Sequence, residues 1–196
     1  LSWTDSFSGQ LVAGAVDLKT GEYYFGGFQT TGSGRNSVQT FRIWKYSPTT
    51  GAITYVGATQ TARGNGIPTS ANGDIAFDSN GNLFIVRGSG NTTTVFSITA
   101  ANLAAANGGA ITSSKSGDYR TSTDVNGVAF DASGKAYLGS STSLSSYNMP
   151  NWSGGASAGS LSGSSDLASC SSPATITLQK KLDGKRYLDA DQFDLE

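Results

Sequence analysis

Histidine is missing from this chain of 196 residues, and the sequence holds a single cysteine, Cys170. Without histidine there is no Ser-His-Asp triad, no histidine general base and no imidazole metal site. One cysteine makes neither an intrachain disulfide nor a multi-thiolate cluster. The phosphate-binding pattern GxxxxGK[ST] is missing too. We therefore expect no cofactor, no metal site and no enzyme activity.

Charge is also scarce: 14% of the residues are charged, and the formal net charge is −1. This balance gives no electrostatic footprint for nucleic acid or an anionic membrane surface. No apolar run approaches the ~20 residues of a transmembrane helix. We predict no nucleic-acid partner and no membrane insertion. Leu1-Ser2-Trp3-Thr4 does not resemble a natural start, so we interpret the chain as a mature form or an excised piece.

Glycine is abundant, with 26 residues, and the apolar residues come in short runs. This composition is typical of short strands joined by tight turns. The clearest case is the stretch 72–86, in which Asn80-Gly81 predicts a hairpin with a type I′ turn. Leu83 to Val86 is continuously apolar, as in a strand buried on both faces.

This hairpin pattern recurs around Asp17, Asp78 and Asp131, which are 61 and 53 residues apart. Repeats of roughly 40–60 residues with four short antiparallel strands are the signature of β-propeller blades. A β-sandwich of about a dozen strands is the alternative, but sandwich strands need not resemble each other at fixed spacing. We therefore predict an all-β fold, a partial β-propeller of about three four-stranded, blade-like sheets.

The predicted sheets are packed side by side and span 10–57, 74–113 and 126–148. Ala110-Ile111-Thr112-Ser113 is expected to close the second sheet, after one short Ala-rich helix with Thr99 as its N-cap. A Gly/Ser-rich loop is expected to follow the third sheet. The predicted domain limits are 1–165 for the propeller-like region, which we expect to be incomplete at its N-terminus, 166–173 for a linker, and 174–196 for the truncated start of a β-sandwich repeat.

The repeated aspartates also have a metal-binding interpretation. Asp78-x-Asn80-x-Asn82 matches the first three ligand positions of a calcium loop. Positions six and twelve of such a loop are Gly and Glu, but here they are Leu83 and Ser89. We therefore interpret Asp78 as a turn residue that accepts hydrogen bonds from nearby backbone N–H groups, and likewise Asp17 and Asp131.

Several loop residues are candidates for ligand binding. Arg87 follows four apolar residues and is placed to point into a central channel. Four further charged residues lie at comparable loop positions, and they are Arg63, Asp74, Arg120 and Asp124. In propellers such loops ring one end of the channel, the usual binding site. The alternative is that all five are solvated loop charges.

Tryptophan is the other candidate residue type, because its ring stacks on sugars. We expect Trp44 to fill space between blades. Trp152 lies in a Gly/Ser-rich loop and is the candidate that we expect to be exposed.

The chain resembles one family in four segments: Gly14 to Gly27, Asn72 to Asp78, Val125 to Asp131, and Asp166 to Cys170. Together they are similar to the propeller-like N-terminal region of large cell-wall-anchored surface proteins of actinobacteria such as corynebacteria. The resemblance implies an extracellular location, attachment to the cell wall, and pilin-type or prealbumin-like repeats after this region. Two departures are that the family region begins well upstream of Leu1 and that the sandwich repeat is only begun.

The tail Ile176 to Phe193 resembles the opening of such a repeat. By this resemblance Lys180 or Lys181 is a candidate for an intramolecular isopeptide bond, whose partner would lie outside this chain. The alternative is a solvated lysine on a strand.

Three blades cannot close a ring, because propellers use about four to eight. The open sheet edges invite pairing, so we expect missing N-terminal blades, a second copy or the tail to cover them. Cys170 lies where the last predicted blade ends. We predict that it forms a disulfide with a cysteine outside this chain, near the mature N-terminus; a free thiol is the alternative.

Three functions stay open at this point. The first is a non-catalytic surface domain that binds a host or matrix protein or glycan, as an adhesin does, or displays other domains. The second is a glycan-active enzyme or lectin of propeller type. It would need paired carboxylates about 5–9 Å apart, for which Asp74 and Asp124 are the candidates. The third is a purely structural spacer.

Overall fold

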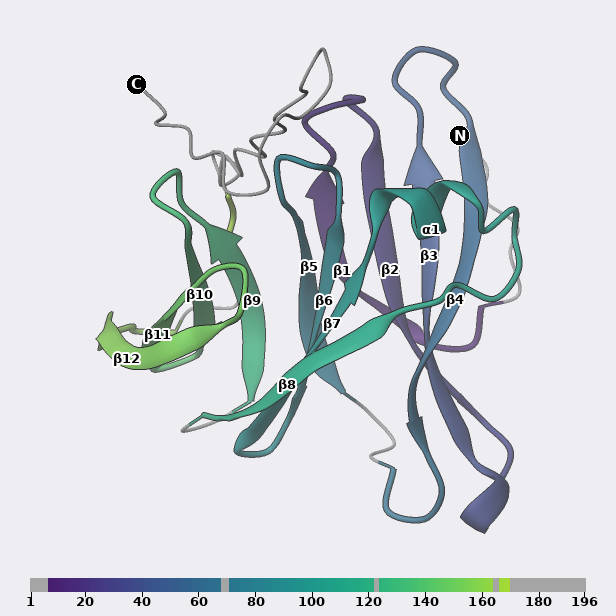
Figure 1. The fold of residues 1–196 in the computed structure, drawn as a ribbon. Helices are drawn as coiled ribbons and strands as arrows, with labels where there is room; N and C mark the ends of the chain where they lie inside the picture. Colours follow the sequence, from purple (N-terminus) through teal and green to yellow (C-terminus); the bar gives the residue numbers. More distant parts are fainter. Residues whose placement is uncertain (1–6, 68–70, 122–123, 164–165, 170–196) are drawn as a thin grey trace, which may run out of the picture.

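Three four-stranded antiparallel sheets stand side by side in the computed structural model, which describes residues 7–67, 71–121, 124–163 and 166–169 (Figure 1). In each sheet the strands pair in chain order, so each sheet is a simple meander. None of the three closes into a barrel. The predicted all-β fold with blade-like sheets is confirmed, and the strands of the first two repeats belong to separate sheets.

The first sheet contains β1 (Gln10–Val16), β2 (Tyr23–Thr31), β3 (Val38–Tyr46) and β4 (Ile53–Arg63). A short 3-10 helix, η1 (Gly34–Asn36), connects β2 to β3. The sheet extends beyond the predicted limit because β4 stays paired with β3 along its whole length.

The second sheet contains β5 (Asn72–Phe77), β6 (Leu83–Ser89), β7 (Thr92–Ile98) and β8 (Ser114–Arg120). Residues Leu83 to Val86 are buried, as their continuous apolar character predicted.

The connection from β7 to β8 holds the helix α1 (Ala100–Ala104). Thr99 is its N-cap, as predicted, and its side chain accepts a 3.1 Å hydrogen bond from the Asn102 amide. The expected closing strand at 110–113 is wrong. Ala110 forms only an isolated bridge with Ala58 of the first sheet, and the polar residues that follow pair with β7 instead.

The third sheet contains β9 (Val125–Phe130), β10 (Lys135–Ser140), β11 (Ser143–Asn148) and β12 (Ser153–Ser160). The expected Gly/Ser-rich loop is therefore wrong over β12, which pairs with β11 as the outer, fully exposed strand. Its sequence has no apolar alternation, so only backbone pairing makes it a strand.

The turns after the inner strands share one device. Asp17, Asp78 and Asp131 each accept, through Oδ1, the amide hydrogen of the residue two positions later. The predicted Asx-type turns are confirmed. The type I′ turn at Asn80-Gly81 is wrong, because Gly81 has a positive φ of 80° whereas Asn80 does not. The connection between β5 and β6 is longer than two residues, and within it only Gly81 adopts the left-handed conformation.

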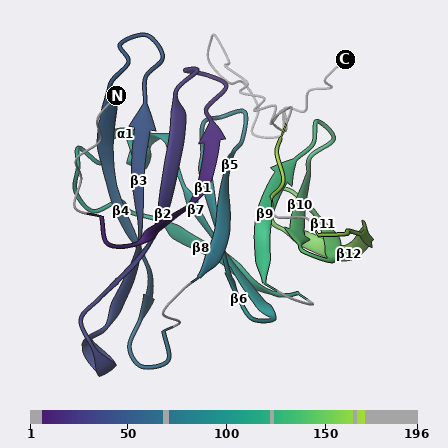
Figure 2. The same ribbon diagram turned by 180° about the vertical axis from the view of Figure 1, so that it is seen from behind.

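The first strand of each sheet lies at the centre of the arrangement, with β1 against β5 and β5 against β9 (Figures 1 and 2). One buried cluster, including Phe41, Ile43 and Ile85, lies between the first and second sheets. A second cluster, including Phe84, Val128 and Leu138, lies between the second and third. Two apolar layers therefore hold the three sheets together.

Trp44 is buried, but it belongs to neither of these clusters. It alternates with Phe41 and Ile43 and lies on the opposite face of the first sheet. There it packs edge-on against Phe7 at 5.0 Å between ring centroids and stacks on Phe25. The expectation that Trp44 fills space between two blades is wrong for the sheets described, because the segment before β1 covers it instead.

Several predicted features lie outside the described residues. They include Cys170 with its disulfide, Lys180 and Lys181 with the isopeptide bond, and the sandwich repeat at 174–196. Of the predicted linker, residues 166–169 are described, and they lie against the inner strands. Within the described ranges no helix is long and apolar enough to cross a membrane.

Candidate functional site

A cleft of about 410 Å³ opens between the first sheet and α1, and we call it the turn-end cleft. It lies at the end of the sheets that carries the Asp17 and Asp78 turns. Its apolar wall includes Val56 and Leu103. Its polar wall includes Asp17, Lys19, Glu22, Tyr24, Lys45 and Asn80. The position follows from the fold, because two packed sheets diverge at their ends and α1 bridges the gap.

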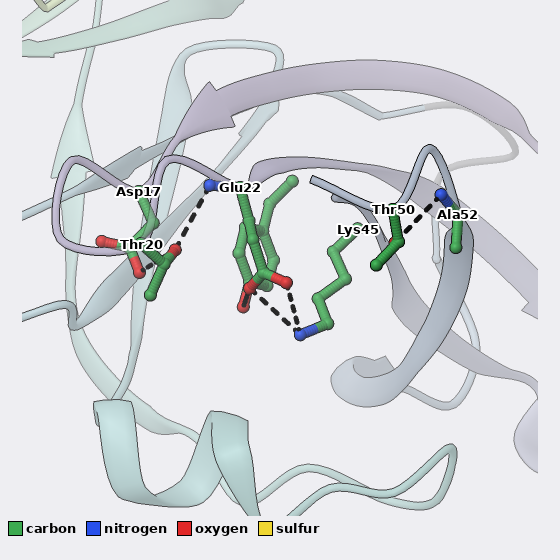
Figure 3. A network of polar contacts seen from close by, with 7 residues as sticks. Asp17, Thr20, Glu22, Lys45, Thr50 and Ala52 are labelled. Atoms are coloured by element: carbon green, nitrogen blue, oxygen red, sulfur yellow. Dashed lines mark hydrogen bonds and ion pairs between the residues drawn. The ribbon is translucent and has the colours of Figure 1, made fainter. Parts of the chain in front are cut away.

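The ion pair of Glu22 and Lys45 is the centre of this cleft. Lys45 Nζ lies 2.9 and 3.0 Å from the two carboxylate oxygens of Glu22, and Figure 3 shows the ammonium directed at them. The side chain of Lys45 is only 33% exposed, and that of Glu22 only 19%. The tip of β3 holds Lys45, while Glu22 is fixed just before β2 by a hydrogen bond from its amide to Thr20 Oγ1.

Tyr24 extends the network toward the core. Its hydroxyl donates to Glu22 Oε2 at 3.4 Å, and its ring packs edge-on against Phe77. Burial raises the pKa of the Tyr24 phenol, and the negative charge of Glu22 raises it further. Tyr24 therefore stays a neutral hydrogen-bonding group.

The arrangement is suited to holding a polar molecule. A lysine ammonium has three donors, and its two contacts with Glu22 leave one for a bound molecule. Hydroxyl and amide groups and an apolar wall surround this donor. Ligand pockets generally combine an apolar lining with a few placed polar groups, in volumes of about 300–1,000 Å³.

Asp74, a predicted site residue, is on the inner strand β5 and is only 3% exposed. Its Oδ1 accepts the Ile75 amide hydrogen at 2.8 Å, and its Oδ2 accepts that of Val128 on β9, also at 2.8 Å. Desolvation is the largest influence and raises the pKa of Asp74 to about 8, although the two amide bonds oppose it. The carboxyl group of Asp166 adds to the rise.

The other predicted charges lie at the opposite end of the sheets from the turn-end cleft. Arg63 and Arg120 are the exposed last residues of β4 and β8, and Asp124 is exposed just before β9. Arg87, near the end of β6, is partly buried. Its Nε has no hydrogen-bond partner among the described residues, and burial lowers the pKa of the guanidinium.

These four residues therefore lie at one end of the sheets. Asp74, which was expected at a comparable loop position, is instead buried within β5. No contact joins them to one another within the described part of the chain. Arg87 instead interacts electrostatically with Asp118. Their role in ligand binding stays a prediction.

The expectation that Trp152 is exposed is wrong, because the side chain is only 3% exposed. Its ring lies about 6 Å from those of Phe84, Tyr119, Phe130 and Tyr147, between the second and third sheets. The segment between β11 and β12 folds the tryptophan back onto this core, with a left-handed φ of 53°.

Sequence reasoning did not identify Glu22, Lys45 or Asp166 as site residues. Glu22 and Lys45 are 23 residues apart, and only the antiparallel pairing of β2 with β3 brings them together. The one signal in the sequence was that Glu22 lies just before β2 and Lys45 near the end of β3, so that pairing of these two strands brings opposite charges to the same end. Asp166 had no signal, because its position depends on the tertiary path of the chain after β12.

Within the described ranges, no group of three or more His, Cys, Asp or Glu residues is placed to hold a metal ion. A comparison of the chain with protein-family models finds no family that matches, and a comparison with curated proteins finds no significant match. The site must therefore be interpreted from its own geometry.

Proposed function

We propose that this chain is a non-catalytic, ligand-binding domain of a bacterial cell-surface protein. In this proposal the turn-end cleft takes a polar ligand of the host or matrix, such as a glycan. The observation that carries the proposal is the partly buried Glu22–Lys45 pair inside a cleft of ligand size. A partly buried ion pair adds little to stability, because the cost of removing its charges from water offsets their attraction. A role in binding therefore explains better why this pair lies at a cleft.

The extracellular setting and the attachment to a cell wall come from the family resemblance of the sequence. They fit a scarcity of charge and a fold made of short strands and tight turns. They also give the ligand class, because a surface protein meets the glycans and proteins of a host or matrix first.

A glycan-active enzyme is less well supported. Asp124 lies just before β9, so the backbones of Asp124 and Val128 are about 13 Å apart in an extended chain. The Asp74 carboxylate lies at the Val128 amide and not at Asp124, whereas a glycosidase needs a carboxylate pair roughly 5–9 Å apart. Asp74 and Asp166 instead line one cavity beside β1, and the charge of Asp166 acts on Asp74.

An array of glycans and matrix proteins tests the proposal directly. We expect the wild-type chain to bind at least one member, and Lys45→Met to weaken that binding about tenfold or more. Hydrogen bonds to charged groups are worth about 1.5–3 kcal/mol, which is the basis of this expectation. Lys115→Met is the matched control, because Lys115 forms an exposed ion pair with Asp118 elsewhere.

Two results would contradict the proposal. If the wild-type chain binds nothing on the array, a structural spacer is the better interpretation. If Lys115→Met weakens binding as much as Lys45→Met does, the ligand does not lie in the turn-end cleft.

A further inference from the structure

The Glu22–Lys45 pair leaves one hydrogen-bond donor and one acceptor side by side, both unused by the described residues. Lys45 Nζ carries three hydrogens, and its contacts with Glu22 Oε1 and Oε2, at 2.9 and 3.0 Å, use two of them. A carboxylate has about four lone-pair sites. Oε2 accepts from both Lys45 and Tyr24, whereas Oε1 accepts from Lys45 alone within the described part of the chain. The free donor and the free acceptor site therefore belong to atoms only 2.9 Å apart.

Few chemical groups match such a pair. A carboxylate only accepts hydrogen bonds and an ammonium only donates them, so each would meet one partner and be repelled by the other. The C=O and N–H of a trans peptide group point in opposite directions, so a backbone amide reaches only one partner. A hydroxyl both donates and accepts, and neighbouring hydroxyls of a sugar ring are about one hydrogen-bond length apart. A vicinal diol therefore matches both partners.

The rest of the cleft suits a neutral sugar. Its charged lining residues are two of each sign, and they are Asp17, Lys19, Glu22 and Lys45. They leave no excess charge to attract an acidic or a basic ligand. Thr54 pairs in register with Lys45 and adds an exposed hydroxyl beside the ammonium. Val56 and Leu103 lie in the apolar wall, which suits the C–H face of a sugar ring.

We propose that the turn-end cleft recognises a neutral sugar residue with two free, adjacent hydroxyls. This inference rests on the proposed function, because it names the class of ligand for the same cleft. Lys45 donates to one hydroxyl, Glu22 accepts from the other, and the ring packs against the apolar wall. A primary amide side chain of a peptide also has a donor beside an acceptor, but it fills little of a cleft of about 410 Å³.

Periodate tests the inference, because it cleaves the carbon–carbon bond of a vicinal diol and leaves isolated hydroxyls intact. The full chain is applied to immobilised neutral oligosaccharides of glucose, mannose and galactose, before and after oxidation with periodate and reduction with borohydride. We expect binding to at least one of them, and a loss of at least tenfold after the treatment. Borohydride alone is the control and should leave binding unchanged.

Two variants place the diol at the ion pair. Glu22→Met removes the acceptor and leaves a positive charge, so it should weaken binding to neutral sugars about tenfold and shift the preference toward uronic acids. Lys45→Met removes the donor and leaves a negative charge, so it should shift the preference toward amino sugars. Asp118→Asn is the matched control, because it removes the acid of an exposed ion pair elsewhere and should bind like wild type. Circular dichroism establishes that each variant is folded, and either variant of the pair suffices.

The outcomes separate this inference from the proposed function. Binding that survives periodate in full, or binding to acidic or amino sugars only, would overturn the diol and leave the proposed function standing. Binding to matrix proteins but to no sugar would likewise overturn the diol, in favour of an amide group. No binding at all, or an equal loss in Asp118→Asn and Glu22→Met, would overturn both.

Discussion

Asp74 on β5 and Val128 on β9 join two neighbouring sheets by a hydrogen bond of 2.8 Å from the Val128 amide to Asp74 Oδ2. The other carboxyl oxygen accepts the amide of Ile75, within β5 itself. One side chain thus accepts hydrogen bonds from N–H groups on two inner strands. These strands belong to separate sheets and are not paired with each other through their backbones. Buried N–H groups rarely stay unpaired, which explains why a carboxyl group is tolerated at this depth.

The raised pKa of Asp74 predicts how stability depends on pH. The folded chain holds the Asp74 proton up to about pH 8, whereas the unfolded chain loses it near the ordinary aspartate pKa of 3.8. Between these values the folded state binds more protons, so the free energy of unfolding should fall as the pH rises, by up to about 1.4 kcal/mol per pH unit. Urea unfolding at pH 5, 6.5 and 8 measures this slope.

Asp74→Asn is the control for this slope, because the amide does not titrate. The absence of histidine removes the side chain that usually titrates between pH 5 and 8, so the contribution of Asp74 should stand out. A flat wild-type profile, or an equal slope in Asp74→Asn, would contradict the assignment.

Substitutions of Trp152 should separate its packing from its polar group. The indole Nε1 is buried and has no hydrogen-bond partner among the described residues. Trp152→Phe keeps an aromatic ring in this space and breaks no hydrogen bond within the described part of the chain, so it should lower the free energy of unfolding by less than Trp152→Ala does. Trp152→Ala should lower it by about 3–5 kcal/mol, because it empties the space among four aromatic rings. Denaturant titration compares the two, and equal losses would contradict the packing role, because the ring that Phe retains would then contribute nothing.

Two glycines under residues 166–169 should respond differently to alanine. At Gly127 the new Cβ would come 2.5 Å from the backbone N of Leu167, whereas at Gly139 it would come 2.8 Å from the tip of the Leu167 side chain. Backbone moves less easily than a side-chain end, so Gly127→Ala should displace residues 166–169 and Gly139→Ala should leave them in place. Amide exchange at Phe130, measured at pH 7, reports this. Equal exchange in both variants would disprove the packing of Leu167.

Some strands could not be located from the sequence. β8 and β12 are the outer strands of their sheets, and both are polar and largely exposed. They lack the apolar alternation that identifies a half-buried strand. Their position depends on backbone pairing with β7 and β11, which a sequence pattern does not reveal.

The candidate site was only partly predictable for a related reason. Asp74 was identified because it lies beside a recurring hairpin. Its partner Asp166 is 92 residues away in the sequence and reaches it only because the chain returns across the inner strands after β12. The burial of Trp152 has the same origin, since a Gly/Ser-rich setting indicates exposure until neighbouring sheets supply aromatic partners.

The sequence by itself determined the repeated strand–turn–strand unit and its Asp-centred turns. These depend on contacts within a few residues, namely side-chain oxygens that accept nearby amides and glycines that adopt positive φ. The tertiary structure alone decided which distant residues meet, including Glu22 with Lys45 through strand pairing, Asp74 with Val128 between two sheets, and residues 166–169 with β9. Such contacts depend on how the twisted sheets pack and where the chain returns, and no local pattern of residues encodes that path.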